Sequence, residues 1–130
     1  MQELTKAEEK IMQLLWEVEQ AFVKELIEKI EGKKPSYTTV STIIRILETK
    51  KFVGHKAYGN THHYFPLVSR EDYAKFVTRS VLDRYFDGSF KKLVSFFAKK
   101  EEIDIEELDD IMKMMEKEEN EEDRNDEKTN

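Results

Sequence analysis

Apolar residues in the first fifty positions repeat with the period of amphipathic helices. The first series predicts a helix over about 5–18, which Thr5 and Glu8 open at the spacing of a capping box. A second series predicts a helix over about 21–31 with Gly32 as its stop. A third helix is expected over about 37–51, and its apolar face carries Val40, Ile43, Ile44 and Leu47.

The pattern then changes to that of a β-hairpin. Residues 52–58 and 61–67 favour strands, and Gly59-Asn60 between them suits a two-residue turn. Such a turn pairs Tyr58 with Thr61 and sets the register of the hairpin. Three helices followed by a hairpin are the elements of a winged helix-turn-helix, in which the hairpin is the wing.

A second helical region follows the hairpin. Ser69 precedes Asp72 at N-cap spacing and opens a predicted helix over about 70–87, which Gly88 ends. Further apolar series begin at Phe90 and at Ile105, and each predicts another helix. From residue 116 onward apolar residues are lacking and charge stays high, which predicts disorder.

The predicted fold class is therefore mainly α with a small β-hairpin wing: a winged helix-turn-helix followed by an α-helical dimerisation region. We place a winged-helix DNA-binding domain at 1–68, a helical dimerisation domain at 69–115 and an acidic, disordered tail at 116–130. The second region has more apolar surface than short helices can bury, so we expect it to meet a second copy of the chain. Packing back onto the winged domain is the alternative. The predicted dimer residues are Tyr73, Phe76, Val77, Val81, Tyr85, Phe86, Phe90, Leu93, Val94, Phe97, Leu108, Ile111 and Met115.

Composition excludes several kinds of protein. The 130 residues include no Cys, so disulfides and thiolate metal sites are absent. No apolar run approaches the roughly 20 residues of a membrane span or the roughly 7–15 of a signal peptide. We expect a soluble, cytoplasmic chain without membrane contact. Of the three hairpin histidines only His55 and His62 would share a face, so no metal site and no cofactor are predicted.

Charge is divided unevenly along the chain. The net charge of −6 argues by itself against a nucleic-acid partner. Between Lys33 and His63, however, six basic residues stand against Glu48 alone, while the acidic residues concentrate after residue 100. Because salt screens charges beyond about 8–10 Å, the local basic region can attract a polyanion whatever the total charge is.

The third helix presents hydroxyl side chains opposite its apolar face. Hydroxyls compete with the helix backbone for hydrogen bonds, and a merely solvated face would more readily use Glu, Lys or Gln. Short hydroxyls and an arginine fork suit a DNA major groove, and lysines at the helix end and on the wing suit phosphates. Double-stranded DNA is thus the expected partner, through contacts by Thr38, Thr39, Ser41, Thr42, Arg45, Lys50, Lys51, Lys56 and Asn60.

Other interpretations of this surface stay open. Chance use of threonine on a surface helix would give the same pattern without function. A winged helix can also dock a protein instead of DNA, or serve as the accessory subunit of an enzyme. No nucleophile-base pair is legible, so we do not expect the chain itself to be an enzyme.

Several motifs resemble those of the penicillinase and methicillin-resistance repressors, the BlaI/MecI/CopY family, over about residues 4–115. The similar segments are Leu4-Thr5-Lys6-Ala7-Glu8 with Leu14-Leu15-Trp16, Thr39-Val40 with Thr42, Leu47 and Lys50, Gly59 with Tyr64-Phe65-Pro66, and Tyr85-Phe86-Asp87-Gly88 with Phe90, Leu93-Val94 and Phe97. Their shared order and spacing make the resemblance strong. It implies a homodimeric transcriptional repressor on a palindromic operator.

The same resemblance implies a route of induction and shows some departures. Family members that govern β-lactam resistance are cut between an Asn and a Phe after a membrane sensor is triggered, so a sensor-activated protease is an implied partner. That pair falls on Phe96 and Phe97 here, where Phe96 replaces the Asn. The recognition helix departs from the family pattern at three positions. Thr38 replaces a basic residue, Ile46 replaces an Arg, and Lys51 replaces the Gly that follows Lys50. A different operator sequence is the natural inference.

Overall fold

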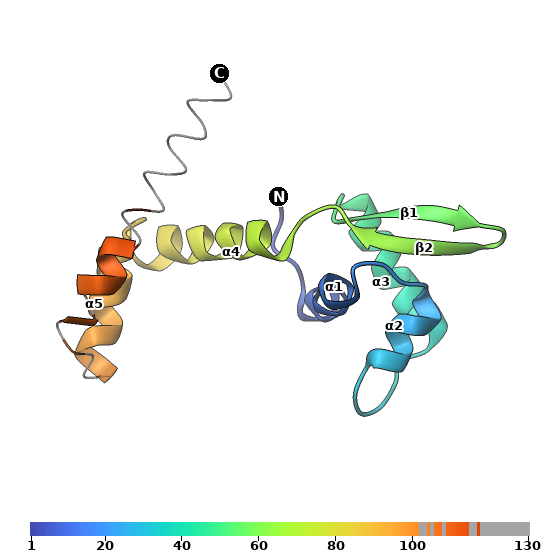
Figure 1. Ribbon diagram of the computed structural model, residues 1–130, viewed down its shortest axis with the longest axis horizontal. Helices are drawn as coiled ribbons and strands as arrows, with labels where there is room; N and C mark the ends of the chain where they lie inside the picture. The colour runs from blue at the N-terminus through green and yellow to red at the C-terminus, as the bar shows by residue number, and fades with distance from the viewer. Residues whose placement is uncertain (102–103, 105, 108, 115–116, 118–130) are drawn as a thin grey trace, which may run out of the picture. The chain divides into compact units, whose positions relative to one another are not determined.

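The chain forms two compact units, which are described separately (Figure 1). The computed structural model describes residues 1–101, 104, 106–107, 109–114 and 117. The first unit is Met1–Val77 and the second begins at Thr78, so the division falls within one helix. The elements in chain order are α1 (Lys6–Val18), α2 (Val23–Lys29), α3 (Tyr37–Thr49), β1 (Val53–Tyr58), β2 (Thr61–Pro66), α4 (Arg70–Tyr85) and α5 (Phe90–Glu101).

These elements confirm the predicted fold class of helices with one antiparallel hairpin. The capping box is present at the start of α1, since the Glu8 backbone N–H donates to Thr5 Oγ1 and the Thr5 N–H donates to Glu8 Oε1. The predicted stop of α2 is wrong. That helix ends at Lys29, and Gly32 (φ +79°) lies in the turn that follows.

The hairpin has the predicted register. Tyr58 pairs with Thr61, and the two neighbouring pairs follow in step. Gly59 has φ +60°, and the φ angle of Asn60 is not positive. This combination matches a type II′ turn with glycine at its first central position. Ala21, between α1 and α2, exchanges two backbone hydrogen bonds with Tyr64 of β2 and so attaches the wing to the helices.

The core of the first unit takes in the beginning of α4. Tyr73 is only 5% exposed, its ring packs near Trp16 and Phe52, and its hydroxyl accepts a 2.8 Å hydrogen bond from the Leu4 N–H. Almost none of this side chain is left for a partner, which argues against its place on a dimer surface. Two other predicted dimer residues pack half-buried against the same core: Phe76 and Val77. The remaining members of this core are Ile11, Met12, Leu15, Ala21, Val23, Leu26, Val40, Ile44, Leu47, Phe52, Val53 and Tyr64.

The second unit buries little. Leu82 and Val94 are its buried apolar side chains among the described residues. Large apolar side chains elsewhere in it stay exposed, namely Tyr85 (71%), Phe96 (45%), Phe97 (47%), Ile111 (37%) and Met114 (68%). Residues 106–107 and 109–114 are helical, in the segment where a sixth helix is expected. Leu108 and Met115, two of the predicted dimer residues, lie outside the described residues, as does most of the acidic tail.

Candidate nucleic-acid interface

The N-terminus of α3 is built by two of its hydroxyl residues. Ser36 is the N-cap, and its Oγ accepts a 3.1 Å hydrogen bond from the Thr39 N–H. Ser36 Oγ also lies 2.9 Å from Thr39 Oγ1. Thr39 thus has a structural role at the cap, although its exposed position leaves it able to contact a ligand.

Two more hydroxyls of α3 are bonded to the helix itself. Thr42 Oγ1 donates to the Thr38 carbonyl at 2.8 Å, and Thr49 Oγ1 donates to the Arg45 carbonyl at 3.0 Å. Such bonds to the carbonyl one turn back are the usual way for a helix to satisfy a threonine. The expectation that these hydroxyls donate to DNA therefore does not fit Thr42, whose hydrogen is already used.

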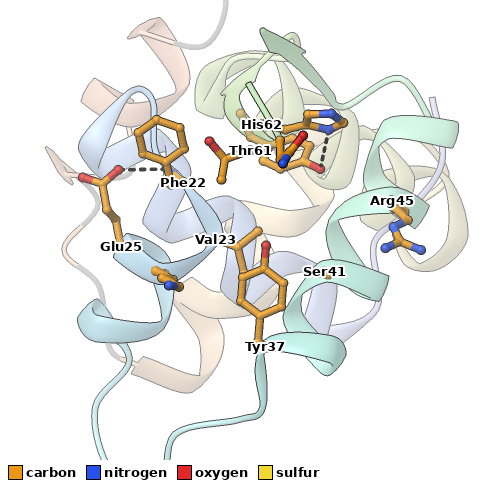
Figure 2. Close-up of a pocket in the computed structure, with 11 residues that line it drawn as sticks. Phe22, Val23, Glu25, Tyr37, Ser41, Arg45, Thr61 and His62 are labelled. Atoms are coloured by element: carbon orange, nitrogen blue, oxygen red, sulfur yellow. Dashed lines mark hydrogen bonds between the residues drawn. The ribbon is translucent and has the colours of Figure 1, made fainter. Parts of the chain in front are cut away.

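Arg45 lies at the edge of a groove between α3 and the wing (Figure 2). The groove has a volume of about 440 Å³. Figure 2 shows Phe22 and Glu25 on one side, Tyr37 and Ser41 from α3 on another, and Thr61 and His62 from β2 closing it. Three predicted DNA-binding residues thus line one concave surface: Ser41, Arg45 and Asn60. Ser41, which was expected on the exposed face of α3, is only 9% exposed and offers little surface for a groove contact.

Lys50 has a different role from the predicted one. Its Nζ lies 2.7 and 2.9 Å from the two carboxylate oxygens of Glu8, which is buried. Burial alone would raise the pKa of Glu8, but the Lys50 ammonium and the Thr5 backbone and hydroxyl outweigh it and hold that pKa below 4.5. Lys50 therefore joins α3 to α1, and the Glu8 carboxylate takes up the ammonium group that the sequence assigned to a phosphate.

Lys51 and Lys56 are exposed, as phosphate contacts require. Lys51 has φ +66° and follows the last turn of α3 in the position that glycine usually takes. The Phe52 N–H donates to the Leu47 carbonyl and the Lys51 N–H to the Glu48 carbonyl, which is the Schellman pattern. Lysine at this position keeps a charge at the end of α3 at the cost of a strained backbone.

The hairpin histidines contact one another and the end of α3. His55 and His62 share a face, as predicted, and their rings stack with centroids 4.1 Å apart. His55 Nδ1 lies 2.7 Å from Glu48 Oε2 and connects β1 to the end of α3. Within the described part of the chain no group of three His, Cys, Asp or Glu residues could hold a metal ion.

Sequence reasoning missed several residues of this surface. Tyr37 and His62 line the groove, and Ile46 lines a second depression on the outer side of α3. Tyr37 is 51% and Ile46 is 42% exposed. The sequence could have marked Ile46 as an exposed apolar residue, because it falls outside the apolar stripe of Val40, Ile44 and Leu47.

The implied cleavage site lies inside a helix. Phe96 and Phe97 are both in α5, well away from its ends, and both side chains are about half exposed. A protease needs an extended substrate, so cleavage between these residues requires local unfolding of α5.

The family model of the penicillinase repressor matches residues 4–117. The chain belongs to the penicillinase repressor family. The methicillin resistance regulatory protein MecI of Staphylococcus aureus (strain N315) is 27% identical over 116 residues, which is 88% of this chain and 94% of that protein. The penicillinase repressors of Staphylococcus aureus and Bacillus licheniformis are 29% and 23% identical and cover 85% and 91% of this chain, and 90% and 93% of their own lengths.

Membership confirms the resemblance seen in the sequence. The penicillinase repressor family consists of DNA-binding regulators of transcription and not of enzymes. Among solved structures, AF1382 from Archaeoglobus fulgidus matches with a TM-score of 0.41 and 20% identity, over 60% of this chain and 85% of that one. No helix of the described residues is long and apolar enough to cross a membrane.

Proposed function

We propose that this chain represses transcription as a homodimer that binds a palindromic DNA operator. The wing and the outer face of α3 form the DNA-binding surface of each copy, and the exposed aromatic residues of the second unit form the dimer interface. Binding across a promoter excludes the transcription machinery, and loss of dimerisation releases the DNA.

Exposure of Arg45 beside the wing is the observation that carries the DNA-binding part. Its guanidinium is the strongest hydrogen-bond donor on the outer face of α3, and it stands at the edge of the groove that the wing closes. Lys51 and Lys56 add exposed positive charge at the end of α3 and on β1. An arginine flanked by lysines suits one guanine and the neighbouring phosphates.

Exposure of Tyr85, Phe96 and Phe97 supports dimerisation. Large apolar side chains grouped in one small unit are typical of interfaces, and cyclic dimers are the commonest assembly of soluble chains. Two copies place their α3 helices about 34 Å apart, or a multiple of it, so that both engage half-sites on one face of the DNA. The protease-dependent route of induction is a further proposal, since it comes from the resemblance alone.

DNA fragments selected by the purified full-length protein test this function. We expect a palindromic consensus, a dimer in light scattering, and binding that weakens steeply as salt rises. Arg45→Ala should weaken operator binding by about 1–3 kcal/mol, with the loss concentrated at one base position. Failure to enrich any DNA, together with salt-independent capture of a protein partner, would instead indicate an interaction module.

A further inference from the structure

Three neighbouring side chains on the outer face of α3 offer methyl groups and no free hydrogen-bond donor. Thr42, Ile46 and Thr49 are exposed there and lie one turn apart along the helix. They share a depression whose other lining residues include Arg45 and Lys50. We call the three side chains the methyl patch.

The threonines of the methyl patch cannot readily donate to a ligand. Each has given its hydroxyl hydrogen to a backbone carbonyl of the preceding turn, at 2.8 Å for Thr42 and 3.0 Å for Thr49. What they offer outward is a methyl group and oxygen lone pairs. Ile46 between them offers apolar surface alone.

We infer that the methyl patch recognises the 5-methyl group of thymine in the major groove. This inference rests on the proposed function. Thymine is the only unmodified DNA base that carries a methyl group on that edge, and apolar side chains make its characteristic contact. Guanine presents only acceptors there, and these would lose their hydration against three side chains that have no free donor.

Arg45 limits this preference to part of the half-site. Its guanidinium is next to the methyl patch and supplies the donors that the patch lacks. The structure therefore assigns to each half-site a guanine or phosphate opposite Arg45, with one or more thymines beside it opposite Ile46. Charge supports DNA over a protein as occupant, because Lys51 is exposed at the end of the same helix.

Deoxyuridine provides a direct test, since it differs from thymidine only by the missing methyl group. An operator is first selected with the full-length protein, and each thymine in it is then replaced by deoxyuridine in turn. We expect about fourfold weaker binding at one or two positions in each half-site, the factor that corresponds to ~0.8 kcal/mol for one buried methyl group. Replacements outside the half-sites should change nothing.

Variants of the protein assign the effect to Ile46. In Ile46→Ala the preference for the thymine operator over the deoxyuridine operator should fall well below fourfold, while Lys51→Ala should weaken both and keep their ratio at about four. Ile46→Arg should move the preference at that position from thymine to guanine. Thermal melting of each variant checks that α3 is intact, since Ile46 lies outside the core.

The outcomes separate this inference from the proposed function. An operator that is bound tightly but shows no deoxyuridine effect at any position would overturn the methyl patch and leave the repressor function standing. Discrimination that persists in Ile46→Ala would overturn the assignment to Ile46. Failure to select any DNA would overturn the proposed function itself.

Discussion

The two units of this repressor differ in how they treat their apolar residues. The first unit encloses a core that runs from α1 to the beginning of α4, and every buried member of it is at most 7% exposed. The second unit buries Leu82 and Val94 but leaves Tyr85, Phe96 and Phe97 between 45% and 71% exposed. A unit that buries its own apolar side chains can present a fixed surface to DNA, whereas a unit that leaves them exposed is suited to bind a partner.

Tyr73 tests this difference most strongly, because the sequence placed it with the partner surface and the structure places it in the core. Tyr73→Ala should lower the free energy of unfolding by about 3–4 kcal/mol, as expected for loss of a buried aromatic ring. Tyr73→Phe should cost about 1 kcal/mol, since it removes only the hydrogen bond from the Leu4 N–H. Denaturant titration measures both.

Self-association supplies the control for Tyr73. Tyr73→Phe should leave the dimerisation constant unchanged in sedimentation experiments, because the ring stays in the core of its own unit. A variant that dimerises poorly while its stability is preserved would return Tyr73 to the partner surface.

Lys50 and its neighbour Lys51 separate a structural from a surface role within the first unit. Lys50→Ala leaves the buried Glu8 carboxylate unpaired and should destabilise by about 2–3 kcal/mol, somewhat below the cost for fully buried pairs because Lys50 is partly exposed. Lys51→Ala is the matched control and should cost little stability. Equal stabilities of the two variants would show that the ion pair contributes nothing.

The same pair gives a pH dependence with a definite sign. Because the pKa of Glu8 is lowered in the folded protein, folding is favoured by its ionised form. The stabilisation is complete above the unfolded pKa of about 4.5 and is lost as pH falls through the lower folded value. The difference in unfolding free energy between the wild type and Glu8→Gln should therefore shrink below pH 4.5.

The sequence predicted the elements of the first unit well because their signals are local. The Thr5–Glu8 box, the period of α3 and the Gly59-Asn60 turn each act within a few residues, and the structure has all three. Partners of single side chains could not be predicted. The bond from Lys50 to Glu8 and that from Leu4 to Tyr73 join residues 42 and 69 positions apart, and nothing in either local sequence marks them.

Hydroxyl residues of α3 show a second limit of sequence reasoning. Their position on the outer face was predicted, but the direction of their hydrogen bonds was not, because a threonine can serve a ligand or its own helix equally well. The structure makes that choice for Thr42 and Thr49.

Phe97 tests whether the exposed side of the second unit is a partner surface. Phe97→Ser removes a half-exposed ring and should weaken dimerisation about tenfold, because each of the two copies in the dimer loses one ring from the interface. Tyr37→Ala removes a similarly exposed ring from the first unit and should leave dimerisation unchanged. Light scattering over a dilution series measures both. A chain that stays equally dimeric in both variants would place the interface elsewhere.

Substitution of Lys51 by glycine is expected to change the free energy of unfolding least. It should raise stability and weaken operator binding at the same time. Its φ of +66° is costly for any residue with a Cβ, so Lys51→Gly should raise the free energy of unfolding by about 1 kcal/mol. Glu19, with φ +72° at the end of α1, is the matched control, and Glu19→Gly should stabilise by a similar amount. Operator binding separates the two positions. Lys51→Gly should weaken operator binding, because a phosphate contact is lost, and it should reduce the slope of log affinity against log salt concentration by about one. Glu19→Gly should leave both the affinity and the slope unchanged. Two variants that are equally stabilised and equally tight on DNA would show that the lysine has no part in binding.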